Sequence, residues 1–123
     1  MRIAVSASEK GPDAPFETHF GRCAYFVIYD SDSKSYVSVP NPGGAAGGGA
    51  GIQAAQAVIG QKVGIVISGR IGPNAYQVLD KAGIKCYGGN GALVKDAIAA
   101  YNHGSLPQLS PSDGPGWGRG RRM

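Results

Sequence analysis

The stretch KVGIVISGRIGPNAYQVLDKAGIKCYG (residues 62–88) decides the fold that the sequence predicts. After its lysine, the run at 62–67 is continuously apolar, which is typical of a strand covered on both faces. Pro73 favours the first turn of a helix, and residues 84–88 form a second short strand. A strand, a helix and a strand in this order predict two parallel strands that are joined by a right-handed crossover.

Further strands and helices are predicted on both sides of this unit. An apolar segment starts the chain, two segments rich in aromatic and β-branched residues flank the turn at 30–34 as a hairpin, and helical spacing recurs twice. The predicted strands cover residues 2–7, 25–29 and 36–39, and the predicted helices cover 52–60 and 91–101. We therefore expect an α/β fold, with a mixed sheet of about five strands, an antiparallel hairpin at one edge and helices on its faces.

Length and composition indicate one folded domain followed by a tail. The 123 residues suffice for one core, which we place at residues 1–104. Residues 105–123 are dominated by Pro, Ser and Gly and carry three arginines, so we expect a flexible, disordered tail. No apolar run approaches the ~20 residues that span a bilayer, and the N-terminus has no signal-peptide pattern. We expect a cytoplasmic protein that does not contact membranes.

The charge of the chain does not indicate a nucleic-acid binder. The formal net charge is +4, but outside residues 105–123 nine basic residues oppose seven acidic ones. The arginines of the tail can contact phosphates and Trp117 can stack on bases, yet one short cluster is a weak signal. Nucleic acid is therefore not an expected partner. The two cysteines form no CxxC motif and predict no disulfide framework.

Glycine-rich segments precede all three predicted helices. They are NPGGAAGGGAG (41–51), SGRIGPN (68–74) and YGGNGA (87–92). Ligands of such sheets bind beyond the carboxyl ends of the parallel strands, where helices begin. Three helix N-termini would offer backbone N–H groups and partial positive charge to one cavity, which suits an anion. The candidate donors and walls of this cavity are His19, Phe20, Gly21, Arg22, Gly48, Gly49, Gly51, Arg70, Ile71 and Asn90.

Several side chains leave alternatives open. His19 can ligate a metal, donate a hydrogen bond to an anion or simply end a loop, and one histidine does not make a zinc site. Arg70 can bind an anion or be a solvated loop residue. Cys23 can be a soft ligand for copper or a sulfur cluster, or a small buried residue at the start of a strand. Cys86, within the predicted strand at 84–88, is expected in the core.

Enzymatic activity finds no support among the motifs. A nuclease of the ribonuclease H type holds metal ions with clustered carboxylates, but residues 2–7 and 62–67 contain no Asp or Glu. No nucleophile–base set for a hydrolase is visible. The glycine loop at 41–51 lacks the Gly-Lys-Ser/Thr of a P-loop, so it does not predict nucleotide binding. We expect a binding protein that is not an enzyme.

Three motifs together resemble a known family. They are HFGRCAYFVIYD (19–30), GIVISGRIGPNAYQVLDKAGIKCY (64–87) and AIAAYNHGSL (97–106). With them, the chain resembles the dinitrogenase iron–molybdenum cofactor biosynthesis domain family over its residues 1–106. That family includes nitrogenase cofactor carriers and the orange proteins, which hold a molybdenum–copper sulfide cluster.

The resemblance implies a ribonuclease H-like fold and a non-catalytic role in binding, storing or transferring anionic metal–sulfur clusters. It places His19 and Arg22 in a cluster-binding loop. The implied cargo is a molybdenum-containing sulfide cluster with copper or iron, for which Cys23 is a conditional metal ligand. The alternative is an interaction or regulatory protein that works with cluster-assembly or nucleotide-binding ATPases.

Overall fold

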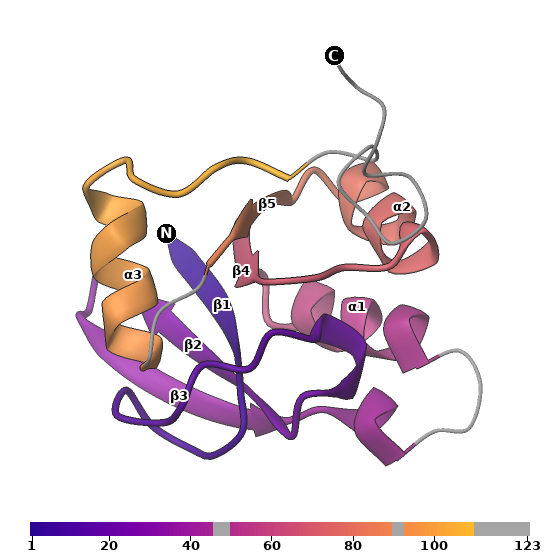
Figure 1. Cartoon of the computed structure of the whole chain (residues 1–123), viewed down its shortest axis with the longest axis horizontal. Helices are drawn as coiled ribbons and strands as arrows, with labels where there is room; N and C mark the ends of the chain where they lie inside the picture. Colours follow the sequence, from indigo (N-terminus) through magenta and orange to yellow (C-terminus); the bar gives the residue numbers. More distant parts are fainter. Residues whose placement is uncertain (46–49, 90–92, 110–123) are drawn as a thin grey trace.

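A five-stranded mixed sheet forms the centre of the molecule (Figure 1). A computed structural model of the chain describes residues 1–45, 50–89 and 93–109. The strands are β1 (Arg2–Ala7), β2 (Tyr25–Asp30), β3 (Ser35–Pro40), β4 (Ile65–Ser68) and β5 (Lys85–Gly88), and their order in the sheet is β3-β2-β1-β4-β5. β1 is antiparallel to β2 and parallel to β4, and β4 is parallel to β5. The mixed sheet with a hairpin edge is thereby confirmed.

Helices cover both faces of the sheet, as predicted. α1 (Ala50–Gly60) and α2 (Pro73–Lys81) lie on one face and α3 (Val94–Asn102) lies on the other (Figure 1). Two short 3-10 turns, η1 (Phe20–Arg22) and η2 (Pro42–Ala45), complete the described elements. Side chains alternate along β1, so that Ala4 faces α1 and α2 while Ile3 and Val5 face α3. The central strand therefore contributes to two separate cores.

Two elements begin three residues later than predicted. The strand expected from residue 62 begins at Ile65, because Lys62 adopts a left-handed backbone (φ 60°) and its N–H donates to the carbonyl of Ile59 at 3.0 Å. The helix expected from residue 91 begins at Val94. The finer assignment to the ribonuclease H-like folds stays a prediction. None of the helices in the described part of the chain is long and apolar enough to cross a bilayer.

Candidate functional site

Two buried hydroxyl groups fix the chain where β1 and β4 end. Ser6 and Ser68 are both fully buried, and the hydroxyl of Ser6 lies 2.9 Å from that of Ser68. The Ser6 hydroxyl is also 2.6 Å from the carbonyl oxygen of Glu17, and the Ser68 hydroxyl donates to the carbonyl of Thr18 at 3.1 Å. A buried hydroxyl is stable when it is hydrogen-bonded, so this pair holds residues 17–18 against the sheet.

Residues 18–20 then run alongside the loop that follows β4. The carbonyl of Thr18 accepts hydrogen bonds from the N–H groups of Gly69 (2.9 Å) and Arg70 (2.7 Å), and the N–H of Phe20 donates to the carbonyl of Arg70 (3.0 Å). A side chain at position 69 would collide with the methyl group of Thr18, so this close approach requires glycine. The loop before η1 and the loop before α2 therefore form one connected unit.

Phe20 anchors η1 in the core. Its side chain is fully buried, and its ring lies 5.0 Å from that of Phe26 between centroids. This anchor places Gly21 against α1, where a Cβ built on Gly21 would lie 3.3 Å from the nitrogen and Cα of Gly51. The 3-10 turn thus presents Gly21 and Arg22 to the start of α1.

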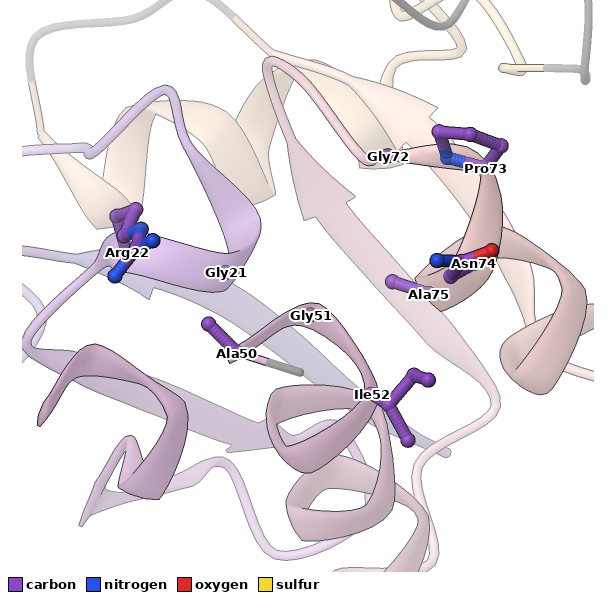
Figure 2. A pocket seen from close by; sticks show the side chains of 9 residues that line it. All are labelled: Gly21, Arg22, Ala50, Gly51, Ile52, Gly72, Pro73, Asn74 and Ala75. Carbon is purple, nitrogen blue, oxygen red and sulfur yellow. The ribbon is translucent and has the colours of Figure 1, made fainter. Parts of the chain in front are cut away.

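A cavity of about 320 Å³ opens where η1, α1 and α2 meet (Figure 2). It is lined by Gly21, Arg22, Ala50, Gly51, Ile52, Gly72, Pro73, Asn74 and Ala75. Seven of these residues belong to the first turns of α1 and α2 or to the N-cap of α2, where the backbone N–H groups, which Pro73 lacks, have no helical partners and carry partial positive charge. Gly72, the N-cap of α2, has no side chain that could satisfy these groups. Arg22 adds a full positive charge, so the cavity offers donors to an anion.

The structure brings together only part of the predicted site. Of the predicted residues, Gly21, Arg22 and Gly51 line the cavity. Phe20 and Ile71, which were expected as its apolar walls, are instead buried in the core beside α1 and α2. Gly48, Gly49 and Asn90 lie outside the described residues.

His19 and Arg70 lie next to each other in a short parallel bridge, but neither is among the residues that line the cavity. The side chain of His19 is 57 % exposed, and its backbone N–H donates to the Glu17 carboxylate at 3.1 Å. The Nδ1 atom of His19 lies 3.3 Å from the same carboxylate oxygen. Glu17, which sequence analysis did not assign to the site, thus places a negative charge beside His19.

The third predicted helix start does not reach the cavity. The N–H groups of Val94 and Lys95 in α3 donate to the carbonyls of Ala14 (2.9 Å) and Pro12 (3.0 Å). The reason is that α3 packs on the opposite face of the sheet from α1 and α2. Two helix N-termini, not three, therefore converge on the cavity within the described part of the chain.

Most of the residues that sequence analysis missed belong to the helix starts. Ala50, Ile52, Asn74 and Ala75 have side chains or backbone at the cavity wall, which also includes the N-cap Gly72 and the first helical residue, Pro73. The motif SGRIGPN indicates this loop, but within it Arg70 and Ile71 were the predicted site residues, whereas Gly72, Pro73 and Asn74 line the cavity. Ala50, Ile52 and Ala75 have apolar side chains, which do not indicate a binding site in a sequence. Only the packing of α1 on α2 places them at the cavity.

Cys23 lies in the core below η1. Its side chain is 1 % exposed, its thiol donates to the carbonyl of Phe20 at 3.4 Å, and the side-chain amide of Asn41 donates to its sulfur at 3.6 Å. Burial raises the pKa of the Cys23 thiol to about 12, so the thiol is neutral at physiological pH. Because the thiolate is the form that binds metals, this environment does not favour ligation by Cys23.

Side-chain ligands for a bare metal ion are not gathered anywhere in the described part of the chain. No group of three or more His, Cys, Asp or Glu residues there is placed to hold a metal ion. The arrangement of Arg22 and two helix starts suits an anion, which such donors bind through charge and hydrogen bonds.

Comparisons with known proteins agree on one family. The sequence profile of the dinitrogenase iron-molybdenum cofactor family matches residues 1–104. The apo form of the orange protein from Desulfovibrio gigas is 35% identical, with a TM-score of 0.84 over 89% of this chain and 92% of that chain. A NifB-type protein from Thermotoga, assigned to the DUF35 family, is 32% identical, with a TM-score of 0.79 over 88% of this chain and 92% of its own.

A more distant structure shares the fold alone. This dinitrogenase-type protein from Methanocaldococcus jannaschii is 22% identical, with a TM-score of 0.66 over 89% of this chain and 95% of that chain. Among curated proteins, no sequence matches the chain. The profile match covers most of the chain, and the structures from Desulfovibrio gigas and Thermotoga, at 35% and 32% identity, agree with it. The chain therefore belongs to the dinitrogenase iron-molybdenum cofactor family.

Proposed function

We propose that the protein is a cytoplasmic, non-catalytic carrier that binds an anionic molybdenum-containing metal–sulfur cluster in the cavity between η1, α1 and α2. The observation that carries this proposal is the convergence of two helix N-termini and Arg22 on one cavity. Molybdenum–sulfur anions carry charge on several sulfur atoms, so a set of N–H donors around them is the complementary surface.

The size of the site agrees with a small inorganic anion. A volume of about 320 Å³ lies at the low end of ligand pockets in general. The wall is built from glycine and alanine at positions 21, 51 and 75, which lets backbone groups approach the anion closely. Asn74, in the first turn of α2, adds a side-chain amide with two N–H donors to the cavity wall.

In this proposal Arg70 adds a positive charge beside the cavity that attracts the anion, and His19 next to it offers an imidazole as a hydrogen-bonding group. They lie side by side in the bridge between the two loops, and Arg70 is continuous in sequence with Gly72 and Pro73 of the cavity wall. Cys23 is not required, because its thiol is buried and its pKa is raised to about 12.

Reconstitution tests the proposal. The full chain is incubated with tetrathiomolybdate and copper, separated from unbound metal, and analysed by visible absorption and metal content. We expect stoichiometric uptake by the wild type and a loss of uptake in the Arg22→Gln variant, which keeps hydrogen-bonding capacity but removes the charge at the cavity. Lys85→Gln is the matched control, because it removes one charge from an exposed residue at the start of β5, the opposite end of the parallel strands.

Three outcomes contradict the proposal. The first is the absence of stoichiometric uptake by the wild-type chain, and the second is equal uptake by the wild type and the Arg22→Gln variant. An equal loss in Arg22→Gln and Lys85→Gln shows that overall charge, and not the cavity, governs uptake.

A further inference from the structure

One buried side chain links η1 to the segment that leads toward α1. Asn41 follows the last residue of β3 and is 7 % exposed. Its backbone N–H donates to the carbonyl of Ala24 at 3.0 Å, so it continues the pairing between the two strands of the hairpin. Asn41 is thus anchored at the end of the sheet.

The side-chain amide of Asn41 holds both neighbours of Arg22. Its nitrogen donates to the carbonyls of Gly21 at 3.3 Å and Cys23 at 2.9 Å. Arg22 lies between these two residues and brings its positive charge to the cavity (Figure 2). The backbone that carries this charge is therefore fixed on both sides by one side chain.

The oxygen of the same amide holds the start of η2. It accepts a hydrogen bond from the N–H of Gly43 at 2.9 Å, which closes an Asx turn. A Cβ on Gly43 would collide with the backbone carbonyl of Ala50, so this turn packs directly against the first residue of α1. Ala50 lines the cavity as well. Asn41 therefore ties two walls of the cavity, η1 and the start of α1, to each other.

The turn that carries Arg22 depends on such external contacts. η1 has only three residues, and the N–H of Arg22 donates to the carbonyl of His19 at 3.3 Å. Short 3-10 turns have poor hydrogen-bond geometry and little stability of their own. The buried ring of Phe20 fixes one end of the turn, and the amide of Asn41 fixes the part that faces the cavity.

We propose that Asn41 is a positioning residue for the anion site, where it holds Arg22 and the start of α1 in place before the anion arrives. The inference rests on the proposed function. Donors that are already ordered bind an anion more tightly, because no free energy is spent on ordering them during binding. Asn41 is not among the residues that line the cavity, so it acts through Arg22 and Ala50.

The experiment replaces Asn41 by serine in the full chain. A serine hydroxyl can accept the N–H of Gly43, as in the related turns of serine, but its single O–H cannot hold the carbonyls of both Gly21 and Cys23. Tetrathiomolybdate with copper is titrated into each protein at low ionic strength, where the attraction between charges is least screened and weak binding is measurable. We expect Asn41→Ser to weaken binding about tenfold, which corresponds to the loss of about one hydrogen bond.

A double-variant cycle separates positioning from general damage. If Asn41 acts through the charge of Arg22, the loss caused by Asn41→Ser should shrink to about twofold in the Arg22→Gln background. Hydrogen exchange at the amides of residues 21–23, measured without any anion, should be faster in Asn41→Ser than in the wild type.

Two control variants should bind the anion like the wild type. Asn102→Ser makes the same replacement at an exposed residue, the last one of α3. Ile98→Val lowers stability in the core on the opposite face of the sheet from α1 and α2.

Three results overturn this inference alone. They are an equal loss of affinity from Asn41→Ser in both Arg22 backgrounds, unchanged exchange at residues 21–23, and a loss in Ile98→Val as large as that in Asn41→Ser. The last result means that affinity follows overall stability. Failure of the wild type to take up the anion overturns the proposed function, and this inference with it.

Discussion

Gly51 of α1 lies so close to Ala75 of α2 that a Cβ on Gly51 would be 3.2 Å from the Cβ of Ala75. Gly21 of η1 approaches Gly51 in the same way. The three elements that form the cavity therefore meet through residues with little or no side chain. The distance between the two helix N-termini, and with it the density of donors around an anion, depends on glycine at position 51.

We expect Gly51→Val to separate α1 from α2. Overpacking at such a contact costs about 1–3 kcal/mol, and the added methyl groups also enter the cavity. Urea unfolding should therefore show a lower free energy of unfolding. Anion uptake should also fall, even under conditions in which the variant is fully folded.

Gly60→Val is the matched control for this substitution. Gly60 is the last residue of the same helix, and a Cβ there meets nothing within 4 Å. It reports the cost of valine in α1 without the contact to α2. If Gly60→Val lowers stability and uptake as much as Gly51→Val, the close approach of the helices is not the cause.

The hydroxyl pair of Ser6 and Ser68 leads to a prediction about the loop before η1. We expect Ser6→Ala to cost about 1–3 kcal/mol, because it removes the 2.6 Å hydrogen bond to the carbonyl of Glu17 and the polar atom that lies 2.9 Å from the buried Ser68 hydroxyl. Ser68→Ala should cost less, since the carbonyl of Thr18 keeps the N–H groups of Gly69 and Arg70 as donors.

Urea unfolding of both single variants and of the double variant measures this difference. The double variant should be more stable than the sum of the single losses predicts, because the two hydroxyls contact each other at 2.9 Å and each single variant removes that contact from the remaining one. Hydrogen exchange at the amides of residues 18–20 should rise in Ser6→Ala. A larger loss for Ser68→Ala, or strictly additive losses, would contradict the prediction.

The fold could be predicted from sequence because its signals are local. Each signal specifies one element and its neighbours in the chain. The signals are the apolar run that ends at Ile67, the proline at the start of α2 and the aromatic hairpin. The hand of the crossover then leaves few arrangements for the sheet. Lys62 was misplaced because its left-handed backbone, which ends the turn after α1, is unusual for a residue with a side chain.

The site was predicted only in part because its geometry depends on contacts between distant segments. The glycine loops indicated helix starts. However, no sequence feature predicted that α3 packs on the other face of the sheet, where its N–H groups donate to the carbonyls of Pro12 and Ala14. Phe20 follows a histidine and precedes a glycine and an arginine, and it was assigned to the cavity wall because of these neighbours. In the fold it faces Phe26, since one side of η1 must be buried to hold the turn.

The two arginines of the predicted site should differ in their effect on binding. Arg22 lines the cavity, whereas Arg70 lies in the loop bridge beside His19. We expect Arg22→Gln to weaken the equilibrium binding of tetrathiomolybdate with copper more than Arg70→Gln, and we expect Arg70→Gln to slow association at low salt. Association measured at two ionic strengths separates these roles, because salt screens the attraction of a rim charge. Equal losses of affinity in both variants would mean that Arg70 also contacts the anion.

The buried thiols predict a loss of stability at alkaline pH. Burial raises the pKa of Cys86 from its ordinary value of 9.0 to about 12. Above pH 9.0 the unfolded chain therefore loses the thiol proton while the folded chain keeps it, so the unfolded state binds fewer protons and the free energy of unfolding falls as pH rises toward about 12. Each such thiol contributes a slope of up to about 1.4 kcal/mol per pH unit.

The Cys86→Ala variant, which keeps Cys23 and all lysines and tyrosines, should lose stability less steeply than the wild type when urea unfolding is followed above pH 9.0. Parallel curves for the two proteins would show that Cys86 ionises in the folded state as readily as in the unfolded chain, and that its burial in the core is not maintained in solution.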